Sequence, residues 1–105
     1  MKTAGVAFAE GRIIVAVMID NSIQIHRVKS FSEMKEILDT AAPEIVGVDK
    51  SAADMYEDLG FGFNVCKISR SDNISSIKSK ISMLSIPRPS DESAIAAAYL
   101  ASETK

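Results

Sequence analysis

Several acidic residues stand where the chain passes from one kind of segment to another. Asp49 directly follows the apolar run Ile45–Val48, and Asp91 and Glu92 open an alanine-rich stretch. Glu10 lies in a turn signal between two apolar runs. Carboxylate oxygens are the ligands that hard divalent cations such as Mg²⁺ prefer. A structural explanation competes in each case, because acidic residues also suit turns, loops before helices and the first turn of a helix.

The other side chains with metal-binding or nucleophilic chemistry are isolated. His26 is the only histidine and Cys66 the only cysteine, so an intrachain disulfide and a thiolate-rich zinc site are excluded. Neither residue has a partner of suitable type nearby in the sequence. We therefore interpret His26 as a surface residue, Cys66 as a small packed or surface thiol, and Ser51 as a helix cap.

A basic stretch covers residues 67–88, in which Asp72 is the only acidic residue. A local basic strip can bind a polyanion although the whole chain has a net charge of −2. Ordinary solvated charge is the competing explanation. Lys78 and Lys80 are two positions apart and so do not share one face of a helix, which argues against a continuous phosphate-binding ridge. The candidate nucleic-acid-binding residues are Lys67, Arg70, Lys78, Lys80 and Arg88.

Length and composition indicate one globular domain, residues 1–105, with 47% hydrophobic and 25% charged residues. The longest unbroken apolar run, Ile13–Ile19, is much shorter than the roughly 20 residues of a membrane helix. The N-terminal residues also lack the apolar run of a signal peptide. We expect a cytoplasmic protein with no membrane partner, which the single cysteine also suits.

The elements that must position these side chains begin with three strands. Residues 3–9 and 12–19 are continuously apolar, which predicts central strands joined by a tight hairpin. Residues 22–29 alternate and predict a strand nearer the edge. The later elements are a helix that starts with the capping pair Ser30 and Glu33 and stops at Pro43, a strand at 44–48, a helix at 51–60, a strand at 61–68, a helix from Ile74 to Leu84, and a helix at 91–102.

Three antiparallel strands followed by alternating helices and strands predict an α/β fold with a mixed sheet and helices on its faces. This order, together with the motif Asp91-Glu92-Ser93-Ala94-Ile95-Ala96-Ala97-Ala98-Tyr99-Leu100, resembles the ribonuclease H-like superfamily. Within it, the chain is most similar to the RuvC-type Holliday junction resolvases and the related YqgF-type proteins. The resemblance implies a ribonuclease H-like mixed five-stranded sheet (βββαβαβα).

The resemblance also implies a carboxylate cluster that binds Mg²⁺ or Mn²⁺ and hydrolyses phosphodiesters. In that family one acid lies on the first strand, a second follows the fourth strand, and others open the last helix. Carried over, Asp49, Asp91 and Glu92 would be catalytic, and Asp49, Asp91 and Glu10 would hold the metal. This sequence departs from the pattern on the first strand, where Ala7 stands in place of the acid.

Three hypotheses follow, and they leave open whether the protein is an enzyme. The first is a nucleic-acid-associated ribonuclease H-like protein, either a divergent metal-dependent nuclease or resolvase, or a relative that binds without cutting. The second is a non-catalytic interaction module, favoured by the missing acid, which would use its edge strand or the segment 74–86 to form a homodimer. The third is a single-domain relative of the sugar-kinase and actin superfamily, although its phosphate-binding glycine turns are missing.

Overall fold

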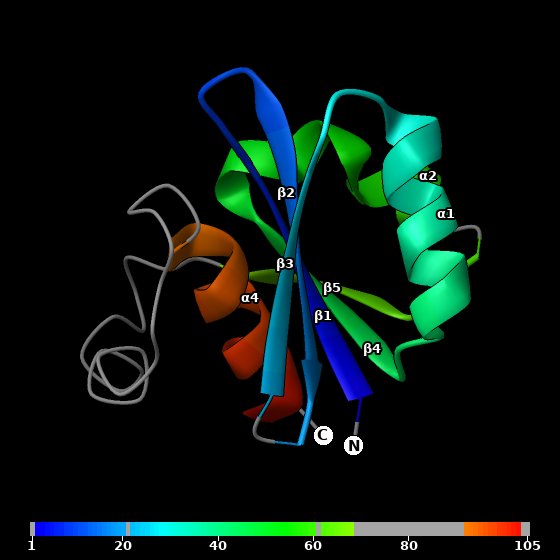
Figure 1. The fold of residues 1–105 in the computed structure, drawn as a ribbon, viewed down its shortest axis with the longest axis vertical. Coiled ribbons are helices and arrows are strands. Elements are labelled where there is room, and N and C mark those ends of the chain that lie inside the picture. The colour runs from blue at the N-terminus through cyan, green and yellow to red at the C-terminus, as the bar shows by residue number, and fades with distance from the viewer. Residues whose placement is uncertain (1, 21, 61, 69–91, 104–105) are drawn as a thin grey trace.

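A twisted five-stranded sheet forms the centre of the computed structural model, with the strand order β3-β2-β1-β4-β5 (Figure 1). The structure describes residues 2–20, 22–60, 62–68 and 92–103. The first three strands pair antiparallel, and the last two run parallel to β1 and to each other. The strands are β1 (Lys2–Ala9), β2 (Arg12–Ile19), β3 (Ser22–Val28), β4 (Ile45–Asp49) and β5 (Val65–Ile68). The predicted mixed α/β sheet is therefore confirmed, with β1 and β2 inside it and β3 at an edge.

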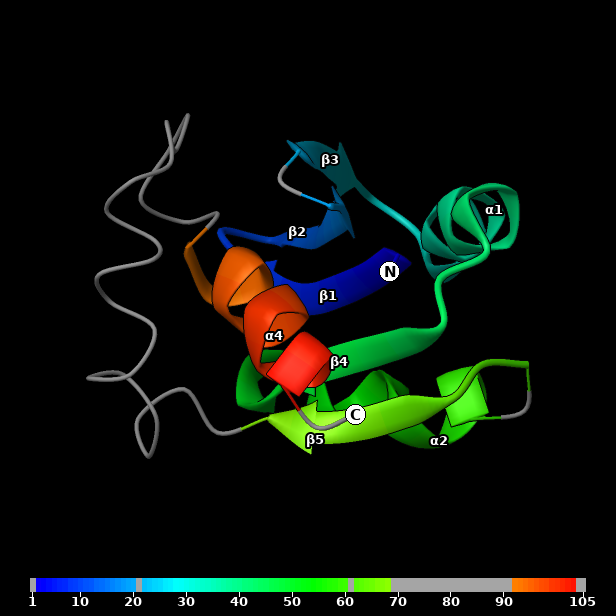
Figure 2. The same cartoon turned by 90° about the horizontal axis from the view of Figure 1, so that it is seen from below.

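Helices cover both faces of the sheet (Figure 2). One face carries α1 (Phe31–Ala41), the 3-10 helix η1 (Lys50–Met55) and α2 (Tyr56–Gly60). The other face carries α4 (Glu92–Glu103). Each face has its own buried cluster: Met34 and Leu38 of α1 pack among the strand valines, while the alanines of α4 pack on Ala7 and Ile14. Burial of these two clusters is the main source of stability.

The predicted cap of α1 forms, with a small shift. The Glu33 N–H donates to the Ser30 hydroxyl at 3.2 Å, as an N-cap requires. The Glu33 carboxylate accepts from the Lys29 N–H at 3.2 Å, one residue before the donor of a standard capping box. The helix ends at Ala42, which adopts the left-handed conformation (φ 51°, ψ 56°) before Pro43.

Two glycines let α4 approach the sheet closely. Gly5 on β1 and Gly47 on β4 are register partners at the centre of the sheet. A Cβ atom at Gly5 would overlap the backbone of Ala94 and Ala98, and one at Gly47 would overlap the Ala97 carbonyl group. The small side chains of α4 thus rest on a trough that only glycine can provide.

The region after β4 differs from the prediction. The helix predicted at 51–60 is broken into η1 and α2, with a non-helical residue at Ala52 (φ −112°, ψ 23°). The strand predicted at 61–68 begins only at Val65, because the backbone N–H groups of Gly62 and Phe63 donate back to the Leu59 carbonyl. Phe63 therefore lies in the turn that follows α2 and not in a strand, despite the apolar alternation.

The helix predicted from Ile74 to Leu84 lies outside the described residues. Within the described ranges, every helix is too short or too polar to cross a lipid bilayer.

Candidate functional site

Asp49 is the last residue of β4 and one of the few buried polar side chains, at 6% exposure. Side chains of a strand alternate between the faces of a sheet. Val46 and Val48 belong to the cluster under α1, whereas Gly47 meets α4, so Asp49 lies on the α4 side. The prediction that this carboxylate stands at the carboxyl end of the fourth strand is confirmed, although Asp49 ends the strand and does not follow it.

A chain of hydrogen bonds holds Asp49 in place. Its Oδ2 accepts from the Ser51 hydroxyl at 2.6 Å and from the Ser51 N–H at 3.0 Å. The Ser51 Oγ in turn accepts from the Phe8 N–H at 2.9 Å. Because hydrogen bonds to a carboxylate are stronger than neutral ones, this chain ties β1 to β4 firmly. The interpretation of Ser51 as a helix cap is wrong, since Ser51 lies inside η1 and bonds backward to the strand.

The position beside Asp49 on β1 is apolar. Val6 is the register partner of Val48, so the next residue, Ala7, lies level with Asp49. Ala7 is fully buried and belongs to the same cluster as Ala94. The methyl group of Ala7 therefore occupies the side of the sheet where a first-strand acid would stand.

The remaining predicted ligands are placed as follows. Glu10 is exposed in the β1–β2 hairpin, where it and Gly11 have positive φ (54° and 73°), as a two-residue turn of the I′ type requires. Asp91 lies outside the described residues. Glu92 is the first residue of α4, whose first turn lies at the same end of the sheet as the carboxyl end of β4 (Figures 1 and 2).

We tested whether these residues fit a divalent metal centre. Among the residues that the structure describes, no three His, Cys, Asp or Glu side chains come together. The buried Asp49 carboxylate already accepts two hydrogen bonds on Oδ2, and Ala7 lies level with it on β1, one residue beyond the pair Val6 and Val48. The described part of the site does not fit the two-metal arrangement that phosphodiester hydrolysis uses.

A small hollow of about 210 Å³ opens beside Asp49 at the carboxyl ends of β4 and β5. Two exposed lysines, Lys50 and Lys67, lie on its wall. Ligands of open α/β sheets usually bind at this end of parallel strands. Lys67 is one of the predicted nucleic-acid-binding residues, and the others (Arg70, Lys78, Lys80 and Arg88) lie outside the described residues.

Sequence reasoning missed Lys50 and the role of Ser51. Lys50 follows the carboxyl end of a buried parallel strand directly, and that position was the available signal. For Ser51 the signal was its spacing of two from Asp49, at which an aspartate side chain commonly accepts from the backbone. Its bond to Phe8 had no local signal, because 43 residues separate the two.

No protein-family model matches the chain, and a search of curated proteins finds no match. Among solved structures, the chain is similar to the crystal structure of the Fowlpox virus resolvase in complex with its substrate, Holliday junction DNA. The TM-score is 0.58, the sequence identity 14%, and the match covers 99% of this chain and 95% of that one. At this identity the likeness establishes the fold: the chain has a resolvase-like α/β fold.

Proposed function

We propose that this protein is a ribonuclease H-like, DNA-associated protein that binds branched DNA and does not cleave it. The observation that carries the proposal is the position of Ala7 level with Asp49, one residue beyond the pair Val6 and Val48, because an apolar residue and a carboxylate bonded to Ser51 stand where a resolvase would need a metal centre. The likeness to a junction-binding resolvase over nearly the whole chain supports branched DNA as the ligand.

The hollow beside Asp49 supports binding of a phosphate backbone. Lys50 and Lys67 are exposed on its wall, and lysine ammonium groups gain affinity for DNA by releasing its counterions. Arg70, Lys78, Lys80 and Arg88 follow Lys67 in the sequence and would extend the same basic surface. Asp49 turns its charge toward Ser51, which reduces its repulsion of a phosphate.

A second candidate is the divergent metal-dependent nuclease. The burial of Asp49 at the end of the sheet where α4 begins favours it, because a buried carboxylate at that place is costly without a purpose. In this alternative Asp49, Asp91 and either Glu92 or Glu10 would hold Mg²⁺ or Mn²⁺. The metal would stabilise charge on the scissile phosphate.

The test uses labelled DNA and RNA substrates in the presence of Mg²⁺ or Mn²⁺: a four-way junction, an RNA–DNA hybrid and single strands. We expect junction binding in a mobility-shift assay that weakens steeply with salt, and no cleavage at any protein concentration. Lys67→Glu should weaken junction binding about tenfold, whereas Lys35→Glu on the exposed side of α1 should not.

Asp49→Asn separates the two candidates. The asparagine carbonyl can still accept from Ser51, so we expect the variant to fold and to bind the junction as wild type does. Cleavage by the wild-type protein that disappears in Asp49→Asn would establish the nuclease and overturn the non-cleaving proposal. Failure to bind any of the nucleic acids would overturn both.

A further inference from the structure

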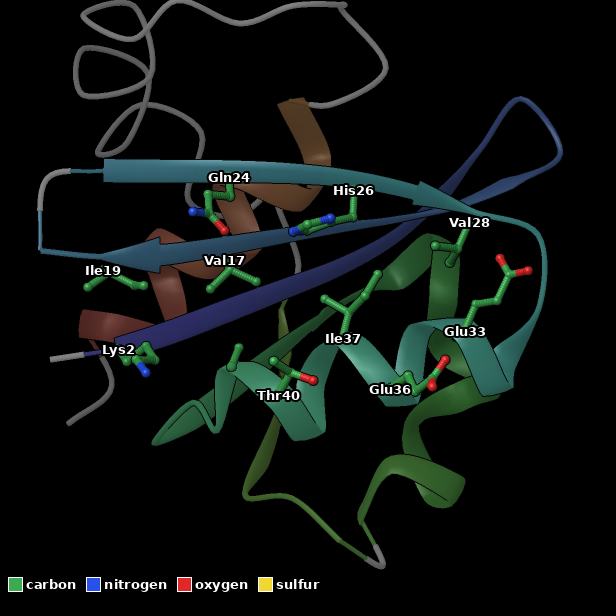
Figure 3. A pocket seen from close by; sticks show the side chains of 11 residues that line it. Lys2, Val17, Ile19, Gln24, His26, Val28, Glu33, Glu36, Ile37 and Thr40 are labelled. Atoms are coloured by element: carbon green, nitrogen blue, oxygen red, sulfur yellow. The ribbon is translucent and has the colours of Figure 1, made fainter.

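A groove larger than the hollow beside Asp49 lies on the α1 face of the sheet, away from the Asp49 side chain. It is a groove of about 610 Å³ between α1 and the sheet face of β2 and β3 (Figure 3). Its volume falls in the range of ligand sites in proteins, about 300–1,000 Å³. Its apolar part is formed by Val17, Ile19, Val28, Ile37 and Ala41.

The groove exists because α1 covers only part of its face of the sheet. Met34 and Leu38 anchor the helix over the sheet centre and are fully buried. Toward β3 the packing opens: Gln24 is exposed and His26 only half-buried, although both face the same side as Val17. Ile19 is 39% exposed at the open end. An apolar strip is thus left in contact with solvent.

Charges of opposite sign mark the two ends of this groove (Figure 3). Lys2 lies at one end, beside Ile19 and level with the start of β3. Glu33 and Glu36 of the first turns of α1 lie at the other end, near Val28. An occupant therefore needs an acidic group near Lys2 and a basic group near the two glutamates.

The edge of the sheet runs beside the groove along its length. β3 is the edge strand, and no strand of the described part of the chain pairs with its outer side. An exposed edge can pair with an extended peptide, whose backbone adds a strand while alternate side chains enter a neighbouring groove. The combination of a free edge, an apolar groove and a helix wall is suited to that kind of ligand.

We propose that this groove binds a short extended peptide of another protein, paired antiparallel to β3. Its N-terminal end carries a basic residue that meets Glu33 and Glu36, alternate apolar side chains fill the groove, and an acidic residue near its C-terminal end meets Lys2. The antiparallel direction is favoured because β3 already pairs antiparallel with β2, and antiparallel pairing is slightly more stable per residue than parallel pairing.

Charge argues against a second copy of this chain as the occupant. In an antiparallel pair of β3 strands, Lys29 of the second copy would lie at the Lys2 end. Asp20 of the second copy would lie at the end with Glu33 and Glu36. Like charges would meet at both ends, which disfavours self-pairing.

The test titrates two capped heptapeptides, Arg-Thr-Val-Thr-Ile-Thr-Glu and its reverse, into the ¹⁵N-labelled protein and follows backbone amide shifts by NMR. We expect saturable shifts of amide signals in β3 and α1. The peptide that begins with Arg should bind with a roughly three- to tenfold lower Kd than its reverse, because only this peptide forms the two partly exposed ion pairs. The double variant Lys2→Glu/Glu36→Lys should invert that preference. Asp39→Lys, on the same helix but outside the groove, should leave it unchanged.

Either of two results would overturn the proposal. One is the absence of shifts in β3 with both peptides while the protein remains folded. The other is equal binding of both peptides by the wild type and the double variant. A concentration-dependent dimer in light scattering that becomes tighter on charge reversal at Lys29, where the reversal removes the repulsion from Lys2, would assign the edge to a second copy instead. None of these outcomes depends on whether the hollow beside Asp49 binds DNA.

Discussion

Ser51 shows how much one hydroxyl group can connect. It donates to a buried carboxylate at the end of β4 and accepts from the backbone of β1, so two central strands are joined beyond their ladder. The position of Asp49 could be predicted from the sequence, because a charged residue after four apolar residues marks a strand end. The bond to Phe8 could not be predicted, since it depends on how two distant segments come together.

Ser51→Ala should lower the free energy of unfolding by about 1–3 kcal/mol, because it removes one of the two hydrogen bonds to the buried Asp49 carboxylate and leaves the Phe8 N–H without its acceptor. Urea denaturation measures the change. Ser22→Ala, at an exposed position that begins β3, is the matched control and should change stability by less than about 0.5 kcal/mol. Equal effects of the two substitutions would show that the chain of hydrogen bonds contributes nothing.

At the scale of elements, strands and long helices followed from the sequence more closely than the turn region after β4. Continuous apolar runs predicted β1 and β2, and the alanine-rich stretch predicted α4 as a helix. The split between η1 and α2 was missed because a side chain of the preceding strand, Asp49, binds the backbone at Ser51 and tightens the first turn. The glycine trough was also missed, since nothing local marks Gly5 and Gly47 as register partners.

Gly47→Ala should destabilise the protein by more than about 2 kcal/mol, because the added methyl group would overlap the backbone of α4 and push the helix from the sheet. Thermal or urea unfolding measures the loss. Gly62→Ala serves as the control, since a Cβ atom there meets nothing within 4 Å. A variant as stable as wild type would mean that α4 lies farther from β4 than described.

Ala42→Gly should stabilise the protein by about 0.5–1 kcal/mol. Ala42 holds the left-handed conformation that ends α1, which glycine adopts without steric penalty. Ala41→Gly, one residue earlier and still inside the helix, should instead destabilise the protein by up to about 1 kcal/mol. Urea denaturation of the two variants side by side decides the point, and a loss of stability in both would contradict the assigned end of the helix.

In the whole molecule, helices cover both faces of the inner strands of the sheet, but this cover is incomplete toward β3. The layered α/β architecture was predictable because it requires only the order of elements and their apolar faces. The uneven cover was not predictable, because it depends on where α1 comes to rest. The homodimer expected from the sequence remains a prediction that light scattering can test.

This uneven cover predicts a gradient in amide hydrogen exchange. The amides of β1 and β4 should exchange only through global unfolding, because both faces of these strands are covered. Amides of β3 should exchange faster through local opening of the edge. Equal protection of β3 and β1, measured by NMR, would show that another chain covers the edge in solution.

The place of α4 also affects how the protein can be made on the ribosome. β1 is synthesised long before α4, yet among the described residues the helix that covers its α4 face begins at Glu92. At about 5–20 residues per second, the nascent chain waits several seconds for that cover while the polypeptide from Glu10 to Asp91 is translated. During this interval the apolar first hairpin lacks the cover that α4 gives it in the folded protein, so binding by a chaperone, or a delay of sheet assembly until α4 has been made, would protect the nascent chain from aggregation.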